Sequence, residues 1–354
     1  MHRKTWVEID LDKIANNIST LISSGHAQYT IGVVKANAYG HGALAISDVA
    51  LQRGVDVLAV ATLDEALELR TVYSAVPILV LGVLVPTSLE IAANHNISVT
   101  AHDLAWLKSV AGSIKSKLRI HLKLDTGMSR LGFTKRSEVN DAAKILDTND
   151  NLVPEGIYTH FAKGDCVLSV AKQISKFEFL TKDIVLSNYK YVHLASSSSL
   201  GLNPQFANTV RLGLAMYGLT SPNAIENVSV CPAFEVFSEV TQVKCLKEGT
   251  YVGYDHSYQL KEPSFVATIP IGYADGLLRH NQGRHVKINQ KKYKIIGSIC
   301  MDQCMVLVDK TIKVGDRVTV LGDDVSISSV AKKLSTIPYE IVCNISYRVP
   351  RVYR

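Results

Sequence analysis

The feature of this sequence that most constrains its fold is a regular alternation between amphipathic helical patterns and short apolar runs. Near the start of the chain, apolar residues recur at the spacing of one helix face: Leu11, Ile14, Ile18, Leu21 and Ile22. The run at 31–35 that follows is apolar up to its last residue, Lys35, and suits a strand buried on both faces. The alternation therefore predicts helices packed around a parallel sheet.

The same pairing of strand and helix recurs far along the chain. Seven further strand candidates lie at 55–60, 77–82, 97–101, 118–124, 155–160, 191–195 and 210–213. Helical stretches such as 63–70 and 170–180 separate most of them. Eight parallel strands joined by helices predict an N-terminal (β/α)8 barrel of the TIM type over residues 10–231, with the active site at the carboxyl ends of the strands. A doubly wound open sheet is the structural alternative.

After about residue 230 the pattern changes to hairpin-like segments. They lie at 234–246, 264–273, 284–297, 305–309 and 317–322. A single helix candidate, at 326–335, interrupts them. We expect a second, mostly β domain over residues 232–354.

Composition narrows the class of protein. The 354 residues carry a formal charge of only +6, and the basic residues form no run suited to nucleic acid or an anionic membrane, so we expect neither as a partner. The start, MHRKTWVEIDLDKI, has charges where a signal peptide needs an apolar segment, which favours a cytoplasmic protein. The six cysteines are widely spaced and are expected to be buried thiols rather than metal ligands.

Several candidate site residues lie where predicted barrel strands end. Burial lowers the pKa of a lysine and so favours its uncharged amine. Schiff-base formation with an aldehyde requires that uncharged amine. A strand-end lysine that simply reaches solvent is the alternative interpretation of Lys35. The other polar residues at strand ends are Lys123 and Arg130 around the fifth strand, His160 after the sixth, Ser196 and Ser197 after the seventh, and Arg211 and Gly213 at the eighth.

The segment that contains Lys35, VVKANAYGHG (33–42), closely resembles the pyridoxal 5′-phosphate (PLP) attachment motif of alanine racemases. Further segments resemble that family in the same order: HLKLDTGMSRLGF (121–133), THFA (159–162), RLGLAMYG (211–218), VGYDHSY (252–258), IGYADG (271–276), CMDQ (300–303) and SYRVPR (346–351). The resemblance implies an α/β barrel followed by a mostly β domain, to which residues 1–9 add a strand. It also implies a homodimer with shared active sites.

The resemblance assigns the two acid–base groups. Lys35 would bind PLP through its amine and exchange the α-proton of D-alanine, while Tyr254 of the partner subunit would act on the opposite face. A tyrosine is a weak base unless its phenolate is stabilised, and His160 with Arg211 offers a hydrogen-bonded cationic relay that would do so. Arg211 also resembles the residue that bonds the pyridine nitrogen, and it would leave that nitrogen unprotonated.

Other matched positions would hold the cofactor and substrate. By similarity, the phosphate would be bound by Tyr39, Ser197, the backbone amides of Gly213 and Leu214, and Tyr347. Arg130 would contact the ring oxygen and the substrate carboxylate, and the amide of Met301, from the partner subunit, would help to anchor the substrate. Lys123 matches a position that is often a carbamylated lysine.

A last group of matched residues resembles the family's substrate access corridor: Asp165, Tyr273, Arg279 and Asp302. Ordinary loop charges are the alternative interpretation of these four. The sequence also departs from the family pattern at two positions. Ser129 stands where many relatives have glycine, and Ser196 stands where they commonly have asparagine.

The function implied is PLP-dependent racemisation of L- and D-alanine, without a metal, to supply D-alanine for cell-wall precursors. A serine racemase or broad-specificity amino-acid racemase is one alternative, because pocket size rather than catalytic machinery sets the accepted side chain. A related decarboxylase is disfavoured by Arg211, since such enzymes place a carboxylate at the pyridine nitrogen. A non-catalytic PLP-binding protein is disfavoured by the β-rich region and Tyr254.

Overall fold

Eight parallel strands close into a barrel, as the alternating pattern predicts. The computed structural model describes residues 2–219 and 228–354. The barrel strands are β2 (Tyr29–Val33), β3 (Val57–Val60), β4 (Ile78–Val80), β5 (Ile97–Ala101), β6 (Leu118–Lys123), β7 (Leu152–Tyr158), β8 (Tyr191–Ser196) and β9 (Thr209–Leu212). Pairing of β9 with β2 closes the ring, so the expectation of a (β/α)8 barrel is confirmed and the open-sheet alternative is wrong.

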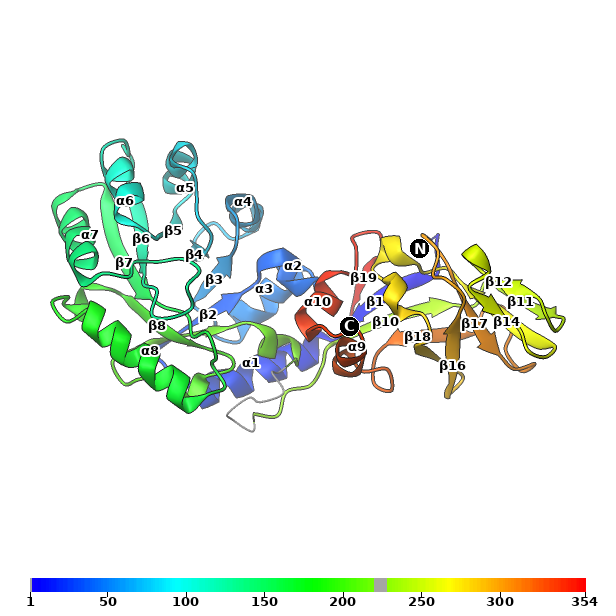
Figure 1. Ribbon diagram of the computed structural model, residues 1–354. Helices are drawn as coiled ribbons and strands as arrows, with labels where there is room; N and C mark the ends of the chain where they lie inside the picture. The colour runs from blue at the N-terminus through cyan, green and yellow to red at the C-terminus, as the bar shows by residue number, and fades with distance from the viewer. Residues whose placement is uncertain (1, 220–227) are drawn as a thin grey trace. The chain divides into compact units, whose positions relative to one another are not determined.

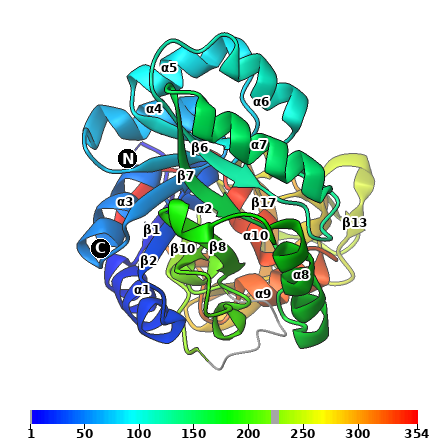
Figure 2. The same cartoon turned by 90° about the vertical axis from the view of Figure 1, so that its left-hand side faces the viewer.

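Helices cover the outside of this barrel (Figures 1 and 2). They are α1 (Leu11–Gly25), α3 (Ala43–Gln52), α4 (Leu63–Val72), α5 (Leu89–Asn94), α6 (Leu104–Ala111), α7 (Arg136–Thr148) and α8 (Val167–Leu180). In α1 the predicted apolar face is the buried one, with Ile14, Ile18 and Leu21 nearly inaccessible to solvent. Covering helices explain why the strands are apolar on both faces.

The segment after β2 has an unusual backbone. The element α2 (Lys35–Tyr39) is a left-handed turn, because Ala36, Asn37, Ala38 and Tyr39 all have φ between 52° and 53°. For a residue with a β-carbon this conformation costs roughly 1–2 kcal/mol. Strain of this kind persists only where the surroundings hold it, and it gathers at functional sites.

Hydrogen bonds to side chains hold the first part of that turn. The Ala36 amide donates to Glu65 Oε1 at 2.6 Å, and the Ala43 amide donates to Asn37 Oδ1 at 2.7 Å. Glu65 also completes a capping box with Thr62 at the start of α4. One carboxylate therefore fixes both a helix start and the turn that follows Lys35.

The chain divides into two compact units, one of Asp12–Ala38 and Ala43–Pro232, the other of Met1–Leu11, Tyr39–Gly42 and Ala233–Arg354. The second unit is built on a nine-stranded sheet in the order β11-β14-β17-β16-β15-β18-β10-β1-β19. These strands are β1 (Thr5–Ile9), β10 (Phe234–Glu239), β11 (Gln242–Leu246), β14 (Ser264–Ile269), β15 (His285–Ile288), β16 (Lys291–Ile296), β17 (Cys304–Val308), β18 (Arg317–Leu321) and β19 (Arg351–Tyr353). The small hairpin of β12 (Tyr251–Val252) and β13 (Tyr258–Gln259) stands apart from this sheet.

One detail of the second unit differs from what the patterns predict. The predicted helix at 326–335 is present as α9 (Ile327–Lys333), but a second helix, α10 (Pro338–Cys343), follows it. Its six residues are too few to show a helical period, although Pro338 stands at its first turn, where proline is favoured.

The cysteines also differ from expectation. Of the six, only Cys304 is buried, while Cys231, Cys245 and Cys343 are exposed. Burial was predicted from the usual preference of the residue type, which local packing overrides here. Among the described residues no helix is both long and apolar enough to cross a membrane.

Candidate active site

Five residues matched to the family's catalytic and cofactor-binding positions meet at the carboxyl ends of the barrel strands. Lys35 follows β2, Lys123 ends β6 and Arg211 lies in β9, while His160 follows β7 and Arg130 lies in the loop after β6. Lys123 and His160 each interact electrostatically with Lys35, Arg130 and Arg211. The barrel thus gathers two lysine amines, two guanidinium groups and one imidazole, an arrangement suited to an anionic ligand.

The Lys123 amine is poised to lose its proton. Burial, followed by repulsion from Arg211 and Arg130, lowers its pKa to about 7, although Asp125 acts in the opposite direction. Its Nζ lies over the ring of Tyr158, 4.8 Å from the centroid. At neutral pH a large fraction of this amine is therefore uncharged and able to act as a nucleophile.

The Arg211 guanidinium is buried inside the barrel and is held by backbone carbonyls. Its Nη1 donates to the His193 carbonyl, and its Nη2 donates to the Thr159 and Leu194 carbonyls, all at 2.9 Å. Among the described residues none accepts a hydrogen bond from its Nε. A fixed cation with one donor remaining is what an aromatic ring nitrogen needs as a partner.

His160 is a neutral partner of Arg211, not a cationic one. Arg211 Nη2 donates to His160 Nδ1 at 3.2 Å, so the ring proton belongs on Nε2. Burial and the surrounding cations, Arg211 foremost, lower the pKa of His160 to about 2. In the hydrogen-bonded pair of His160 and Arg211, Arg211 therefore carries the charge, and His160 is a neutral donor beyond it.

A chain of hydrogen bonds runs from Arg211 to a carboxylate through two buried histidines. Arg211 Nη1 lies 2.8 Å from His193 Nδ1, His193 Nε2 lies 3.0 Å from His121 Nδ1, and His121 Nε2 lies 3.1 Å from Glu155 Oε2. Because a carboxylate only accepts and a guanidinium only donates, each imidazole in this chain donates toward Glu155 and accepts from the Arg211 side. The guanidinium at one end of the chain and the carboxylate at the other therefore fix the tautomers of both histidines.

The protonation states of His193 and Glu155 agree with this direction of hydrogen-bond donation. Burial, helped by Arg211, lowers the pKa of His193 well below its ordinary value, so that ring is neutral. Burial tends to raise the pKa of Glu155, but hydrogen bonds from His121 and Ser98 outweigh it, and the net shift is downward. The Glu155 carboxylate also pairs directly with Arg119, whose Nε lies 3.4 Å from Glu155 Oε1, so the hydrogen-bond chain sets the tautomers of the rings and does not by itself neutralise Arg211. The Tyr158 ring stacks on His193, with centroids 4.4 Å apart, and holds that ring in place.

Gly156 makes room for this chain of hydrogen bonds. A β-carbon at residue 156 would lie 2.2 Å from His121 Nδ1. No side chain fits there while the His121 ring occupies its observed position. A glycine inside a barrel strand is thus explained by the close approach of an imidazole.

The loop that carries Arg130 is closed by a short bridge. The Phe133 amide donates to the Lys123 carbonyl and the Asp125 amide donates to the Phe133 carbonyl, both at 2.9 Å. Ser129 has φ of 56°, in the left-handed region. The departure from glycine noted at this position therefore places a β-carbon where glycine is preferred.

Three of the residues matched to the phosphate site come directly after strands β8 and β9. Ser197 follows β8, and its Oγ accepts the Gly213 amide at 2.9 Å. Leu214 opens the short 3₁₀ turn η4 (Leu214–Tyr217), whose first N–H groups have no acceptor within the turn. Ser197, Gly213 and Leu214 are thus together in the barrel unit, and one of the two expected amides is engaged by the serine.

The remaining matched residues belong to the β-rich unit, with one exception. Asp165 lies in the barrel unit, in the loop between His160 and α8. The β-rich unit holds Tyr39, Tyr254, Tyr273, Arg279, Met301, Asp302 and Tyr347. Three of these side chains are strongly exposed: Tyr254 at 65%, Met301 at 52% and Tyr347 at 94%. Tyr39 is buried instead, with its ring 5.9 Å from that of Tyr339.

Hydrogen bonds connect the loops that bear the exposed residues. The Tyr273 amide donates to the Cys300 carbonyl at 3.1 Å, so the turn η6 (Tyr273–Asp275) lies beside the Met301 loop. Asp302 pairs with Arg348, next to Tyr347, at 2.6 Å. The turn η5 (Tyr254–His256) is linked to the same region, because the Ser298 amide donates to Ser257 Oγ at 2.9 Å. These loops form one connected surface of the β-rich unit.

Three residues of the hydrogen-bond chain at Arg211 are not predicted from the sequence, namely His121, His193 and Glu155. A signal existed for the histidines. His193 interrupts a largely apolar strand run, and His121 lies two residues before Lys123, hence on the same face of β6. Their mutual contact depends on the register between β6, β7 and β8, which no pattern in a single sequence specifies.

Comparisons with known proteins place the chain in a family. The family models for the alanine racemase N-terminal domain and C-terminal domain match residues 9–221 and 233–353. Alanine racemase 1 of Bacillus subtilis is 40% identical over 364 residues, which cover 99% of this chain and 93% of the relative. Alanine racemase of Geobacillus stearothermophilus is also 40% identical, over 99% of this chain and 94% of its own.

Solved structures give the same result. The crystal structure of alanine racemase from E. faecalis superimposes with a TM-score of 0.93 at 35% identity, covering 100% of this chain and 99% of its own. A histidine racemase from Leuconostoc mesenteroides superimposes with a TM-score of 0.92 at 28% identity, covering 100% and 98%. The fold therefore accommodates racemases of different amino acids, but the identity over the whole length is decisive: this chain belongs to the alanine racemase family.

Proposed function

We propose that this enzyme interconverts L- and D-alanine with PLP as cofactor, using Lys35 on one face of the substrate and Tyr254 of the partner subunit on the other. The observation that carries the proposal is the meeting of Lys35, Lys123, Arg130 and Arg211 with a neutral His160 at one end of the barrel. The D-alanine formed would supply cell-wall precursors, as the family resemblance implies.

The residues of the barrel fit PLP. Arg211 Nε remains to donate to the pyridine nitrogen, and Ser197 with the Leu214 amide suits the phosphate, to which the Gly213 amide would have to turn from Ser197 Oγ. Tyr39 and Tyr347 would add hydroxyl donors to that phosphate. When bound, PLP supplies a conjugated ring that spreads the negative charge left on the substrate as the α-proton departs.

The chain's own residues would move and hold the protons. The Lys35 amine accepts or returns the α-proton on its face of the substrate, and the phenol of Tyr254 of the partner subunit does so on the other. His160, neutral and bonded to Arg211, presents its Nε2 proton to stabilise that phenolate. Because Arg211 does not yield its proton at neutral pH, it keeps the ring nitrogen unprotonated, and reprotonation of the substrate is favoured over side reactions.

Arg130 would orient the substrate by its carboxylate, and the amide of Met301 of the partner subunit would share that anchoring. The exposure of Tyr254 and Met301 supports a homodimer with shared sites, because both side chains project from one connected loop surface. Asp165, Tyr273, Arg279 and Asp302 would line the access corridor.

Racemisation itself is tested by proton NMR of the PLP-loaded enzyme with L-alanine in heavy water, together with a chiral assay. We expect loss of the α-proton signal and appearance of D-alanine. L-serine, run in parallel, should exchange more slowly. Faster exchange of L-serine would assign a different substrate, and absence of all exchange from a PLP-loaded protein would support the cofactor-binding alternative.

Replacing Tyr254 by phenylalanine should lower kcat for racemisation by about 10²–10⁴-fold, because one of two acid–base groups is removed. The absorbance of bound PLP should not change. Tyr251→Phe is the matched control, since Tyr251 is a nearby exposed tyrosine that stacks on His256 at 4.4 Å. A Tyr254→Phe enzyme that loses its cofactor band, or that keeps full activity, would contradict the assignment.

We further propose that Lys123 is carbamylated and that the added negative charge holds Arg130. Carbon dioxide reacts with the uncharged amine, and the pKa of about 7 means that acid protonates it and mild alkali frees it. The carbamate signal in ¹³C NMR with labelled bicarbonate should therefore grow as the pH rises from about 6 to 8. Lys123→Met should abolish the signal, whereas the exposed Lys172→Met should not; a signal absent from the wild-type enzyme throughout this range would refute carbamylation.

The chain from Arg211 to Glu155 is proposed to orient Arg211 toward the cofactor. Glu155→Gln should lower the free energy of unfolding by about 1–3 kcal/mol, since a charged hydrogen bond is lost. It should also change the ¹⁵N shifts of His121 and His193, because glutamine no longer imposes one tautomer. The exposed Glu178→Gln should leave both readouts unchanged. Unaltered histidine shifts in Glu155→Gln would show that the carboxylate does not set the tautomers.

A further inference from the structure

A second buried arginine lies in the β-rich unit and is none of the residues assigned above to catalysis or cofactor binding. Arg284 directly precedes β15, and only 4% of its surface is exposed. Its Nη1 donates to the Val320 carbonyl at 2.7 Å. Its Nε and Nη2 are buried and have no hydrogen-bond partner among the described residues.

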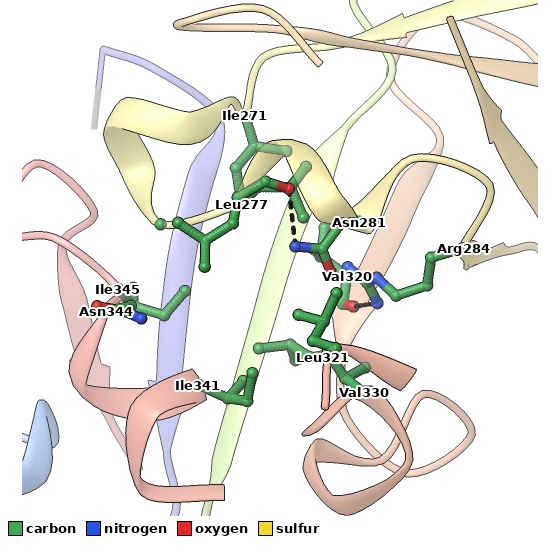
Figure 3. A pocket seen from close by; sticks show the side chains of 13 residues that line it. Ile271, Leu277, Asn281, Arg284, Val320, Leu321, Val330, Ile341, Asn344 and Ile345 are labelled. Carbon is green, nitrogen blue, oxygen red and sulfur yellow. Dashed lines mark hydrogen bonds between the residues drawn. The ribbon is translucent and has the colours of Figure 1, made fainter. Parts of the chain in front are cut away.

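Those unpartnered nitrogens border a small cavity (Figure 3). The cavity has a volume of about 20 Å³, which is room for one water-sized occupant. Its walls are largely apolar and include Leu277, Leu321, Val330 and Ile341. Figure 3 shows the guanidinium directed toward Asn281 and Val320, with the apolar side chains on the other walls.

The surroundings do not neutralise the guanidinium. Burial lowers the pKa of Arg284 only to about 10, so the group is still charged at neutral pH. None of the residues that line the cavity is acidic, and no ion pair involves Arg284 in the described part of the chain. The one interaction that favours its charge comes from Cys304, but burial raises the pKa of that thiol to about 12, which leaves it uncharged.

Nearby cations add to the uncompensated positive charge around Arg284. Burial lowers the pKa of Lys333, and repulsion from Arg284 and Lys294 lowers it further, which places all three positive charges within interaction range. An isolated buried charge costs several kcal/mol unless an opposite charge accompanies it. A water molecule would satisfy one or two N–H groups but would leave the charge uncompensated.

We propose that this cavity is a structural binding site for one small inorganic anion of halide size, held by Arg284 Nε and Nη2. Two donors on a planar guanidinium bind one anion at the same time, and the apolar walls exclude larger species. The cavity also borders the segment from Gly276 to Asn281. That segment continues from the turn bearing Tyr273 and contains Arg279, so the anion would stabilise the base of the corridor loops.

The direct test uses crystals of the PLP-loaded enzyme grown with sodium bromide. We expect an anomalous bromide peak within hydrogen-bonding distance of both Arg284 Nε and Nη2. An ordered water at this place with no anomalous signal would overturn the proposal. PLP loading matters because the cationic barrel site is itself able to attract halides.

A solution test separates this site from general salt effects. The Tm of the PLP-loaded enzyme is measured in sodium chloride and in sodium gluconate, whose anion is too large for the cavity, at equal ionic strength. At a chloride concentration about tenfold above Kd, the Tm should be higher in chloride by about 2 °C.

Arg284→Met should abolish that difference, while Lys332→Met, which removes an exposed positive charge from the same unit, should retain it. An equal chloride effect in Arg284→Met and wild type would refute the site. If Arg284→Met does not fold, the bromide experiment on the wild-type enzyme decides alone.

Discussion

The architecture of the barrel unit depends on how it holds one buried arginine in place. Arg211 is buried, and its Nη groups donate to three backbone carbonyls and two imidazoles. Two histidines connect this network to Glu155, whose carboxylate also pairs directly with Arg119 at 3.4 Å. Among the described residues no carboxylate contacts Arg211 itself, so its cation remains available to a ligand at the carboxyl ends of the strands.

Much of the barrel was predictable because its strands and helices repeat short local patterns. The runs at 97–101 and 191–195 correspond to β5 and β8 almost residue for residue, and the helical face of α1 is the buried one. Family resemblance supplied Lys35, Arg130, His160 and Arg211, which the barrel does bring together. Their protonation was not predictable in this way. The neutral state of His160 and the lowered pKa of Lys123 arise from burial beside cations that are distant in sequence.

Other features depend on tertiary context that a single sequence does not specify. Nothing in the residues Ala-Asn-Ala-Tyr predicts four consecutive left-handed conformations, and the Ala36–Glu65 hydrogen bond joins segments 29 positions apart. Residues 39–42 group with the β-rich unit although they follow the first barrel strand directly. Helix α10 is too short to leave a periodic signal. The Arg284 cavity likewise forms between segments from Ile271 to Ile345 and has no local signature.

Gly156 has a consequence for how relatives of this chain are able to diverge. A β-carbon at that position would overlap the His121 ring, so a side chain at position 156 and an imidazole at position 121 compete for the same space. A lineage that acquires a side chain at 156 must first shrink or reorient residue 121, and with it give up the imidazole contact to His193. Substitutions at these two positions should therefore covary, because the space left by a glycine is what lets the His121 imidazole keep its hydrogen bond to His193.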